Sequence, residues 1–500
     1  MTFKRVSGIL LHPTSLPGPY GIGDLGPQAY RFVDFLADSG GNLWQILPLG
    51  PTGYGDSPYQ CFSAFAGNPY LISPDELIAD GLLEAEDLQN RPEFTPTRVD
   101  FGTLIPWKLQ LLERAFDRFG TYDESTLREA LANFRAENAS WLDDFALFMS
   151  LKEGHGGGSW DAWPEGLRQR DPKALAQARQ QYADRIARHI FYQFLFYRQW
   201  WALRDHANQR GIQIIGDIPI FVAYDSADVW SNPELFYLDE TGKPTVVAGV
   251  PPDLFSATGQ LWGNPLYNWE VHHRDGYAWW LERVRATLRN VDLIRLDHFR
   301  GFAGYWEIPA GNPTAEFGRW VAGPGSDFFD MLMADLQEHL GARDLPIIAE
   351  DLGVITSDVV ELRERYNLPG MRILQFGFTS PDNPFLPHHY VPNCVAYSGT
   401  HDNNTARGWF ETAGEEERNF ALRYLGVDGK HFSWDLIRTI WASGAVFAIA
   451  PMQDFLNLGT EARMNFPSTL GGNWEWRMTE GDLSESLLQG LRELNYLYSR

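Results

Sequence analysis

Eight short apolar segments, separated by stretches of helical character, constrain the fold of this chain more than any other feature. Each segment is rich in aliphatic residues and ends in polar or glycine residues, which is typical of parallel strands buried on both faces. The eight segments span residues 7–13, 42–50, 211–222, 291–299, 345–353, 370–378, 393–403 and 444–455. Apolar residues at helical spacing lie between most of them, at 28–40, 277–290, 328–341 and 357–366.

This alternation predicts an α/β fold of the (β/α)8 TIM barrel type. A doubly wound open sheet is the alternative, and the lack of a GxGxxG fingerprint after a strand weakens it without excluding it. A barrel with insertions can exceed roughly 400 residues as one unit. We therefore expect one barrel domain over residues 1–500.

Two spans are too long for ordinary loops of such a barrel. Residues 51–200 are predicted to form a mainly helical insertion after the second strand, and residues 223–290 a second insertion, rich in Pro, Gly and Trp, after the third. Structured insertions at these positions usually shape the catalytic face of a barrel. We expect both to line the site.

Charge and composition narrow the choice of partner. The formal net charge is −24, and such an acidic surface repels nucleic acid and anionic membranes, so a neutral substrate fits better. Aromatic residues make up 14% of the chain. Most of them will fill the core, but some can form flat binding platforms for sugar rings or bases.

The cysteines and the N-terminus bear on the compartment. The chain has only two cysteines, Cys61 and Cys394, which predicts no disulfide framework and a reducing compartment. The first apolar run ends at His12 and Pro13, too early for a signal peptide, and no apolar stretch reaches the roughly 18 residues of a membrane span. We expect a soluble, cytoplasmic enzyme without a membrane partner.

The segment IRLDHFRG, residues 294–301, places unusual charge at the end of a predicted strand. Side chains alternate along a strand, so Arg295 and Asp297 share one face. If the apolar face meets the helices, both point into the barrel mouth, where barrel enzymes place catalytic residues. A guanidinium two residues away favours the ionised form of Asp297, as a carboxylate nucleophile requires. Arg300 is expected to be a structural ion-pair partner just past the strand.

Later strands repeat this arrangement. Glu350 ends the next predicted strand, and His401 and Asp402 end the strand two further on. Three carboxylates at three strand ends are typical of glycoside chemistry, with a nucleophile, an acid/base and a third group that grips sugar hydroxyls. Each charge could instead cap a loop or form an ion pair. The carboxylates and histidines could also ligate a divalent metal.

From about residue 8 to about residue 478 the chain resembles 4-α-glucanotransferases, also called amylomaltases or disproportionating enzymes, in their bacterial form. The motifs that carry this resemblance are HPTSLPGPYGIGDLG, QILPLGPTGYGDSPYQ, SAFAGNPYLI, DIPIFVA, VAGVPPD, GQLWGNPLYNW, IRLDHFRG, YWEIPA, AEDLGVIT, LPGMRILQF, GTHDNNT and EARMNFPS. The resemblance implies a retaining transferase of the α-amylase clan, with a barrel that lacks a C-terminal β domain. The chemistry requires no cofactor, and the sequence shows no obvious calcium loop.

The resemblance also implies roles for the three carboxylates in a double displacement. Asp297 matches the nucleophile that forms the covalent glucosyl–enzyme. Glu350 matches the general acid/base, and Asp402 the third carboxylate, which holds the distorted donor ring. Arg295 matches the arginine beside the nucleophile.

Further substrate-binding residues are implied in the same way. His298 and His401 look like the histidines that hydrogen-bond the sugar next to the cleaved bond. Tyr59 looks like an aromatic platform at the donor end, and Asp217 like a supporting residue on the third strand.

The acceptor side follows from the second insertion. Asp253, Gln260 and Trp262 resemble the loop that covers the acceptor, so residues 223–290 would shape an acceptor groove. Tyr54 is expected on a secondary glucan-binding surface.

The predicted activity is transfer of α-1,4-glucan segments from a donor to an acceptor glucan or to glucose, with some cyclisation of long chains. Water could resolve the same covalent intermediate, so an α-glucan hydrolase is the closest alternative and a metal-dependent barrel enzyme the more distant one. The expected substrates are α-1,4-glucans and maltooligosaccharides. The sequence makes no prediction of the oligomeric state.

Overall fold

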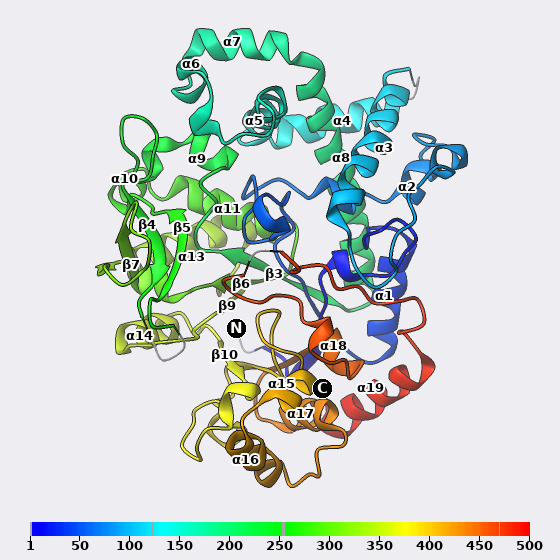
Figure 1. The fold of residues 1–500 in the computed structure, drawn as a ribbon, viewed down its shortest axis with the longest axis vertical. Helices are drawn as coiled ribbons and strands as arrows, with labels where there is room; N and C mark the ends of the chain where they lie inside the picture. Colours follow the sequence, from blue (N-terminus) through cyan, green and yellow to red (C-terminus); the bar gives the residue numbers. More distant parts are fainter. Residues whose placement is uncertain (1–2, 122–124, 253–255, 470) are drawn as a thin grey trace.

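Eight parallel strands close into a barrel in the order β1-β12-β11-β10-β9-β6-β3-β2 (Figure 1). They are β1 (Val6–Leu10), β2 (Leu43–Gln45), β3 (Gln213–Pro219), β6 (Leu293–Asp297), β9 (Ile347–Ala349), β10 (Gly370–Ile373), β11 (Cys394–Tyr397) and β12 (Phe447–Pro451). Each lies in one predicted segment, β1 starting one residue earlier. The TIM barrel is confirmed and the open sheet is wrong. This computed structural model describes residues 3–121, 125–252, 256–469 and 471–500.

The strands pack as buried parallel strands should, because their residues face the barrel interior on one side and the helices on the other. All five residues of β1 are buried, as are all five of β12. Gly8 in β1 meets a steric requirement, since a Cβ there would lie 2.3 Å from the carbonyl oxygen of Leu43 on β2. This contact lets the two short strands pair closely.

Helices follow most of the strands and cover the barrel. The four predicted helical stretches are α1 (Pro27–Asp38), α11 (Ala278–Leu288), α13 (Gly325–Leu340) and α14 (Ser357–Arg365). Helix α1 turns Phe32, Val33 and Leu36 into the core at the expected spacing. Between β10 and β11 the structure has two short 3-10 turns, Leu374–Gly377 and Pro387–His389, where the repeat would place a helix.

The chain between β2 and β3 is helical and forms the upper part of Figure 1. Its helices are α2 (Pro74–Ala79), α3 (Phe101–Thr121), α4 (Ser125–Glu137), α5 (Leu142–Gly154), α6 (Glu165–Arg168), α7 (Pro172–Gln181) and α8 (Ala183–Gln209). Helix α8 runs back into the barrel layer and contacts α1. Lys152 of α5 forms an ion pair with Asp225, which ties the helical region to the loop after β3.

A second, four-stranded antiparallel sheet lies beside the barrel, in green at the left of Figure 1. Its order is β5-β4-β7-β8, built from β4 (Val246–Val250), β5 (Gln260–Pro265), β7 (Gly304–Pro309) and β8 (Arg319–Ala322). Two of these strands precede the barrel strand β6 and two follow it. Helices α9 (Ala227–Ser231), α10 (Trp269–Arg274) and α12 (Arg300–Ala303) connect this sheet to the barrel.

After β11 the chain is again helical. The remaining helices are α15 (Ala406–Thr412), α16 (Glu415–Leu425), α17 (Phe432–Ala442), α18 (Met452–Phe455) and α19 (Glu485–Tyr498). The described residues beyond β12 form helices and turns with a single isolated bridge, and no β domain is found among them. Among the helices of the described ranges, none offers a stretch long and apolar enough to cross a bilayer.

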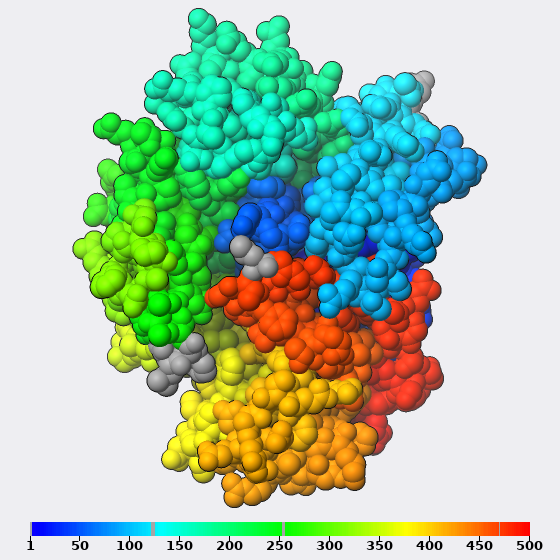
Figure 2. Space-filling model, viewed as in Figure 1, coloured from blue at the N-terminus to red at the C-terminus, as the bar shows by residue number. Residues whose placement is uncertain are grey.

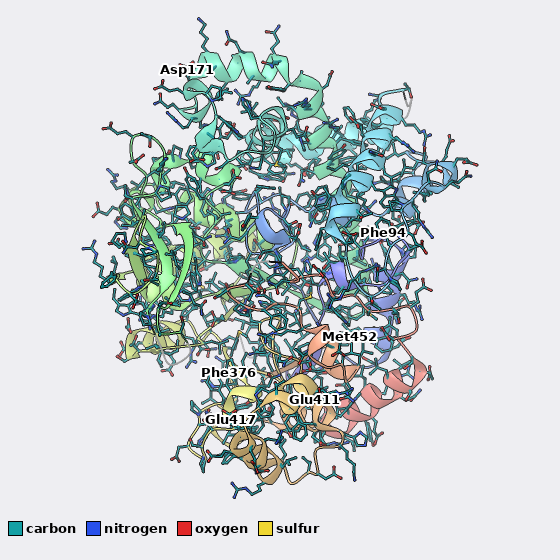
Figure 3. The ribbon with its side chains drawn as sticks, viewed as in Figure 1. Phe94, Asp171, Phe376, Glu411, Glu417 and Met452 are labelled. Carbon is teal, nitrogen blue, oxygen red and sulfur yellow. The ribbon has the colours of Figure 1, made fainter. Side chains whose placement is uncertain are left out.

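Side chains fill the interior around one large core that joins the barrel to its helices (Figure 3). On the face shown in Figure 2, the orange-red segment after α18 crosses the middle of the molecule. The second sheet flanks this segment on one side and the light-blue helical region on the other. The polar side chains at this face come from the segment after α18, from the second sheet, from the helical region and from the barrel strands.

Candidate active site

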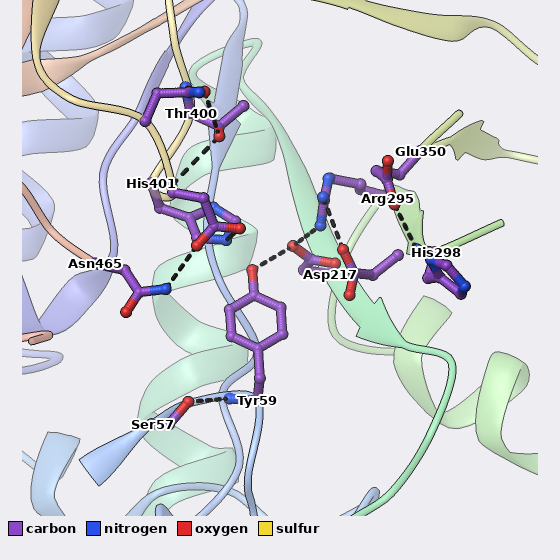
Figure 4. Close-up of polar contacts among 12 residues, drawn as sticks. Ser57, Tyr59, Asp217, Arg295, His298, Glu350, Thr400, His401 and Asn465 are labelled. Atoms are coloured by element: carbon purple, nitrogen blue, oxygen red, sulfur yellow. Dashed lines mark hydrogen bonds and ion pairs between the residues drawn. The ribbon is translucent and has the colours of Figure 1, made fainter. Parts of the chain in front are cut away.

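Strand β6 places Arg295 between two carboxylates. Its Nη2 lies 2.8 Å from Oδ1 of Asp297 and its Nη1 lies 2.6 Å from Oδ2 of Asp217 (Figure 4). Arg295 and Asp217 are partners in the register of β6 and β3, so neighbouring strands bring them together. Burial disfavours the cation, but the two carboxylates outweigh it and raise the pKa of Arg295. The guanidinium therefore stays charged and forms an ion pair with the carboxyl group of Asp297.

Glu350 follows β9 directly and is held by the backbone of two turns. Its Oε2 accepts a hydrogen bond of 2.7 Å from the amide of His298, the residue after Asp297, and its Oε1 accepts one of 2.7 Å from the amide of Leu352. Burial and the nearby charge of Asp297 raise the pKa of Glu350 to about 8, against the effects of Arg295 and the two amides. At neutral pH the group holds a proton that it can donate.

Asp402 lies in the loop after β11 and is held by side chains. Nδ2 of Asn465 donates a hydrogen bond of 2.7 Å to its Oδ1, and Nε2 of His401 lies 3.3 Å from its Oδ2. Arg463 donates to its main-chain carbonyl oxygen. Desolvation would raise the pKa of Asp402, but His401, Asn465 and Arg295 together hold it well below its usual range. Its side chain is 47% exposed, so a charged acceptor faces the site.

Tyr59 connects the two halves of the site. Its hydroxyl donates a hydrogen bond of 2.8 Å to Oδ2 of Asp217, and its ring stacks on His401 with centroids 5.1 Å apart (Figure 4). The ring of Trp474 lies 5.8 Å away on the same side. Burial raises the pKa of Asp217 to about 6, despite the charge of Arg295. A continuous chain of contacts thus runs from Asp402 to the strand end of β6.

His298 meets the second sheet. Its backbone has a φ of 50°, a left-handed conformation, and its ring lies edge-to-face on Trp262 of β5 at 4.8 Å. Burial lowers the pKa of His298 to about 4, so its imidazole is neutral and can both donate and accept a hydrogen bond. Nε1 of Trp262 donates to Oε1 of Gln260 at 3.2 Å. Both aromatic and amide groups of β5 therefore lie beside the strand end of β6.

One expected binding residue, Tyr54, is not part of this cluster, since it is 76% exposed on a 3-10 turn, Tyr54–Asp56. Another, Asp253, lies outside the described residues. Within the described part of the chain, Arg300 does not have the expected ion-pair geometry. Its guanidinium lies over the ring of Trp320 at 3.8 Å and donates to the carbonyl oxygen of Val354.

The site contains four further side chains that the sequence did not indicate as individual residues. Asn465 and Arg463 hold Asp402, Trp474 flanks Tyr59, and His12 lies behind them with a pKa lowered to about 3 by burial and by His401. The motifs HPTSLP and EARMNFPS contain three of the four, so motif membership was the available signal. Trp474 has a φ of 66°, a left-handed conformation that no local sequence pattern predicts.

The arrangement suits chemistry at a glycosidic bond. A proton-holding carboxyl and an ion-paired carboxylate meet at one turn, and environments that separate two carboxyl groups in this way define an acid and a nucleophile. In residues 3–121, 125–252, 256–469 and 471–500, no group of three or more His, Cys, Asp or Glu side chains is placed to hold a metal ion.

Comparison with known proteins identifies the family. The family model described as 4-alpha-glucanotransferase matches residues 11–484. The chain is 53% identical over 493 residues to the 4-alpha-glucanotransferase of Thermus thermophilus, covering 97% of each protein. It is 49% identical over 504 residues to that of Synechocystis sp., covering 100% of this chain and 99% of the relative.

A solved structure agrees with these relatives. An amylomaltase from Streptococcus agalactiae in complex with acarbose superposes with a TM-score of 0.95 at 42% identity, covering 99% of this chain and 100% of the other. These findings favour a glucan transferase over the hydrolase and the metal-dependent alternatives. The chain belongs to the 4-α-glucanotransferase family.

Proposed function

We propose that this enzyme transfers α-1,4-glucan segments by a retaining double displacement centred on Asp297 and Glu350. The observation that carries the proposal is the shared turn: the amide that follows Asp297 holds Oε2 of Glu350. Arg295 forms an ion pair with Asp297, and burial keeps Glu350 protonated. A proton donor beside an ion-paired carboxyl group is what a retaining mechanism needs.

In the first step Asp297 attacks the anomeric carbon of the donor, and Glu350 gives its proton to the departing glycosidic oxygen. The donor glucan is then bonded to Asp297, and the released segment leaves. In the second step the ionised Glu350 takes a proton from the hydroxyl of an acceptor sugar, which attacks the anomeric carbon and frees Asp297. Two inversions at one carbon give net retention.

Other side chains would hold the donor ring during both steps. Asp402 presents an ionised, half-exposed carboxylate to ring hydroxyls, and Tyr59 with His401 offers a stacked aromatic surface. The neutral imidazole of His298 can hydrogen-bond a sugar hydroxyl without adding charge. Asp217 acts indirectly, by fixing both Tyr59 and Arg295.

The acceptor groove is assigned to the insertion over residues 223–290, where Gln260 and Trp262 lie beside His298. The helical insertion over 51–200 would form the opposite wall. Tyr54, with its ring exposed, would serve a secondary glucan-binding surface. These walls would favour sugar over water as the second reactant.

The substrates proposed are α-1,4-glucans and maltooligosaccharides, with glucose as an acceptor and some cyclisation of long chains. The chemistry as written needs no cofactor. A reducing, cytoplasmic location fits the two free cysteines, Cys61 and Cys394.

Incubation with maltotriose alone tests the activity. We expect glucose together with longer oligomers while the total number of reducing ends stays constant, because each transfer breaks and makes one glycosidic bond. A steady rise in reducing ends with only shorter products would establish hydrolysis and overturn the proposal.

A further inference from the structure

Arg300 occupies an unusual position for a charged residue. It begins α12, three residues after Asp297, and is only 8% exposed. Its guanidinium is covered by the ring of Trp320 at 3.8 Å and donates to the carbonyl oxygen of Val354. Asp358 of α14 adds a favourable charge, but burial still lowers the pKa of Arg300. A buried cation held mainly by a ring and a carbonyl needs a reason to be there.

The two turns that Arg300 joins are the turns that hold Glu350. One carboxyl oxygen accepts from the amide of His298, two residues before Arg300, and the other accepts from the amide of Leu352, two residues before Val354. The Arg300–Val354 hydrogen bond therefore closes the same pair of segments a short distance beyond the carboxyl group. It acts as a second crosslink parallel to the first.

The turn at His298 has a backbone conformation that benefits from such a crosslink. His298 has a φ of 50°, which is costly for a residue with a Cβ, whereas Gly353 takes its φ of 90° without strain. A turn with such a residue persists only when the surroundings hold it. The aim of the two amides at Glu350 depends on the turns keeping these conformations.

The second sheet supplies the outer support. Helix α12 runs directly into β7, and β8 returns to place Trp320 over Arg300. The contact is close, since the amide of Gly323 donates to Ala303 at 2.9 Å and a Cβ on Gly323 would lie 2.3 Å from the carbonyl oxygen of Phe302. Trp320 remains 43% exposed, so its inner face is used for the guanidinium.

We propose that Arg300 is a positioning residue that locks the turns at His298 and Leu352, so that their two amides hold Glu350 in place under the support of Trp320. The proposal rests on the proposed role of Glu350 as acid/base. It gives β8 a role at the site, because this strand carries Trp320. In this proposal Arg300 acts through Glu350 and does not touch the substrate itself.

Loss of the lock has a specific consequence. The groups that act on Glu350 are Asp297, which raises its pKa, and Arg295 with the two amides, which lower it. If the turns relax, the amide contribution weakens and the pKa of Glu350 rises further. The alkaline limb of the kcat/KM profile should then move to higher pH. A residue that only stabilises the fold would not move that limb.

The test compares Arg300→Met with Arg300→Lys. Methionine keeps an apolar stem but removes the guanidinium, whereas lysine can still donate to Val354 while losing the planar stack on Trp320. With maltotriose we expect Arg300→Met to lower kcat by about tenfold or more, because small misplacements of a catalytic group are costly, with KM changing by less than about twofold. We expect the alkaline limb to rise by about half a pH unit or more. Arg300→Lys should recover part of both effects.

Arg170→Met is the matched control. Arg170 also lies over an indole, that of Trp230 at 4.3 Å, and pairs with Asp144 at 2.8 Å, but it belongs to the helical region. It should lower the apparent Tm and leave the pH profile unchanged. If Arg300→Met lowers kcat and Tm without moving the limb, its role is only structural and the proposal is overturned.

Two further variants complete the test. Should Arg300→Met fail to fold, Trp320→Leu removes only the support, and it must move the limb in the same direction by a smaller amount. Glu350→Gln separates the two proposals. A Glu350→Gln enzyme that keeps full activity and its alkaline limb would overturn the acid/base role, while an unmoved limb in Arg300→Met overturns only the lock.

Discussion

The carboxyl groups of Glu350 and Asp402 lie on two sides of one site and are held in opposite ways. Glu350 is buried and bound by two backbone amides, whereas Asp402 is half exposed and bound by the side chains of Asn465 and His401. The first environment raises a pKa to about 8, and the second keeps a pKa well below its usual range. The surroundings thus make the carboxyl group of Glu350 a proton donor and that of Asp402 a permanent charge.

The two sides also draw on different parts of the chain. The Glu350 side is built from barrel strand ends and the second sheet, so its geometry is fixed by backbone. The Asp402 side depends on long side chains from the segment that crosses the face in Figure 2, including Arg463 and Trp474. Backbone-held groups should respond to substitution in an all-or-none manner, and side-chain-held groups in a graded one.

The largest expected effect comes from Glu350→Gln, which keeps the shape of the group and removes its proton. General acid/base catalysis contributes about 10²–10⁴-fold, so we expect kcat/KM for maltotriose to fall by about 10³-fold. With α-glucosyl fluoride, whose leaving group needs no proton, formation of the glucosyl–enzyme should persist.

Asp297→Asn is the control for that assignment. Without the nucleophile, both maltotriose and the fluoride should fail to react, while glucan binding, measured by calorimetry, is retained. Equal losses on both substrates for Glu350→Gln would show that the group does not serve as the acid.

The pH dependence of kcat/KM should reflect the same difference between Glu350 and Asp402. The protonated form of Glu350 is lost as pH rises through about 8, so kcat/KM should fall about tenfold per pH unit beyond that point. Asp402 stays charged over the working range, because its pKa lies below the usual range. Profiles from pH 5 to 10 check this, and activity that still rises above pH 9 would contradict it.

For Asp402, the variant Asn465→Ala removes one of the two side chains that contact its carboxylate. A hydrogen bond to a charged group is worth about 1.5–3 kcal/mol when buried, and exposure reduces this to about 1 kcal/mol, or about fivefold in kcat/KM. Asn393→Ala is a fair control, because its amide donates to Asn367 at 3.1 Å before β11 begins. A loss above about 10³-fold for Asn465→Ala would remove the distinction between backbone-held and side-chain-held groups.

Sequence reasoning succeeded where structure is local. Eight strands buried on both faces leave apolar runs that can be recognised one by one, and strand alternation with position at a strand end indicates Asp297 and Glu350 as groups that face the barrel mouth. The same reasoning could not find the second sheet. Its strands pair across the intervening barrel strand β6, and segments such as VVAGV and QLWGNP carry glycines that blur any two-residue period.

Contacts between side chains that lie far apart in the chain could not be predicted from the sequence either. Asn465 lies more than sixty residues after Asp402 and reaches it only because the chain folds back over the barrel mouth. Arg300 was expected to be a structural ion-pair partner just past the strand. The ring that covers it belongs to β8, in a sheet that no local pattern predicts.

The smallest expected effects concern stability, and they should have opposite signs. The folded-state pKa of Glu350, about 8, exceeds its ordinary value of about 4.3. Between these pH values the folded protein binds a proton that the unfolded chain does not, so the free energy of unfolding falls as pH rises. Glutamine does not titrate, and Glu350→Gln should therefore raise the apparent Tm at pH 8.5, by about 1–2 °C, with little change at pH 4.5.

Asp402→Asn should do the reverse. Its pKa is depressed in the folded state, so its charge contributes stability above the unfolded value of about 3.9 and loses that contribution as pH falls. The variant should lower the apparent Tm at pH 8.5, and the difference should narrow below pH 4. Calorimetric scans of both variants at pH 8.5 and 4.5, with a further scan of Asp402→Asn at about pH 3, measure this directly. If the apparent Tm of both variants shifted in the same direction at pH 8.5, the two carboxyl groups would share one electrostatic environment. The bound glucan would then have to make one group a proton donor and the other a permanent charge.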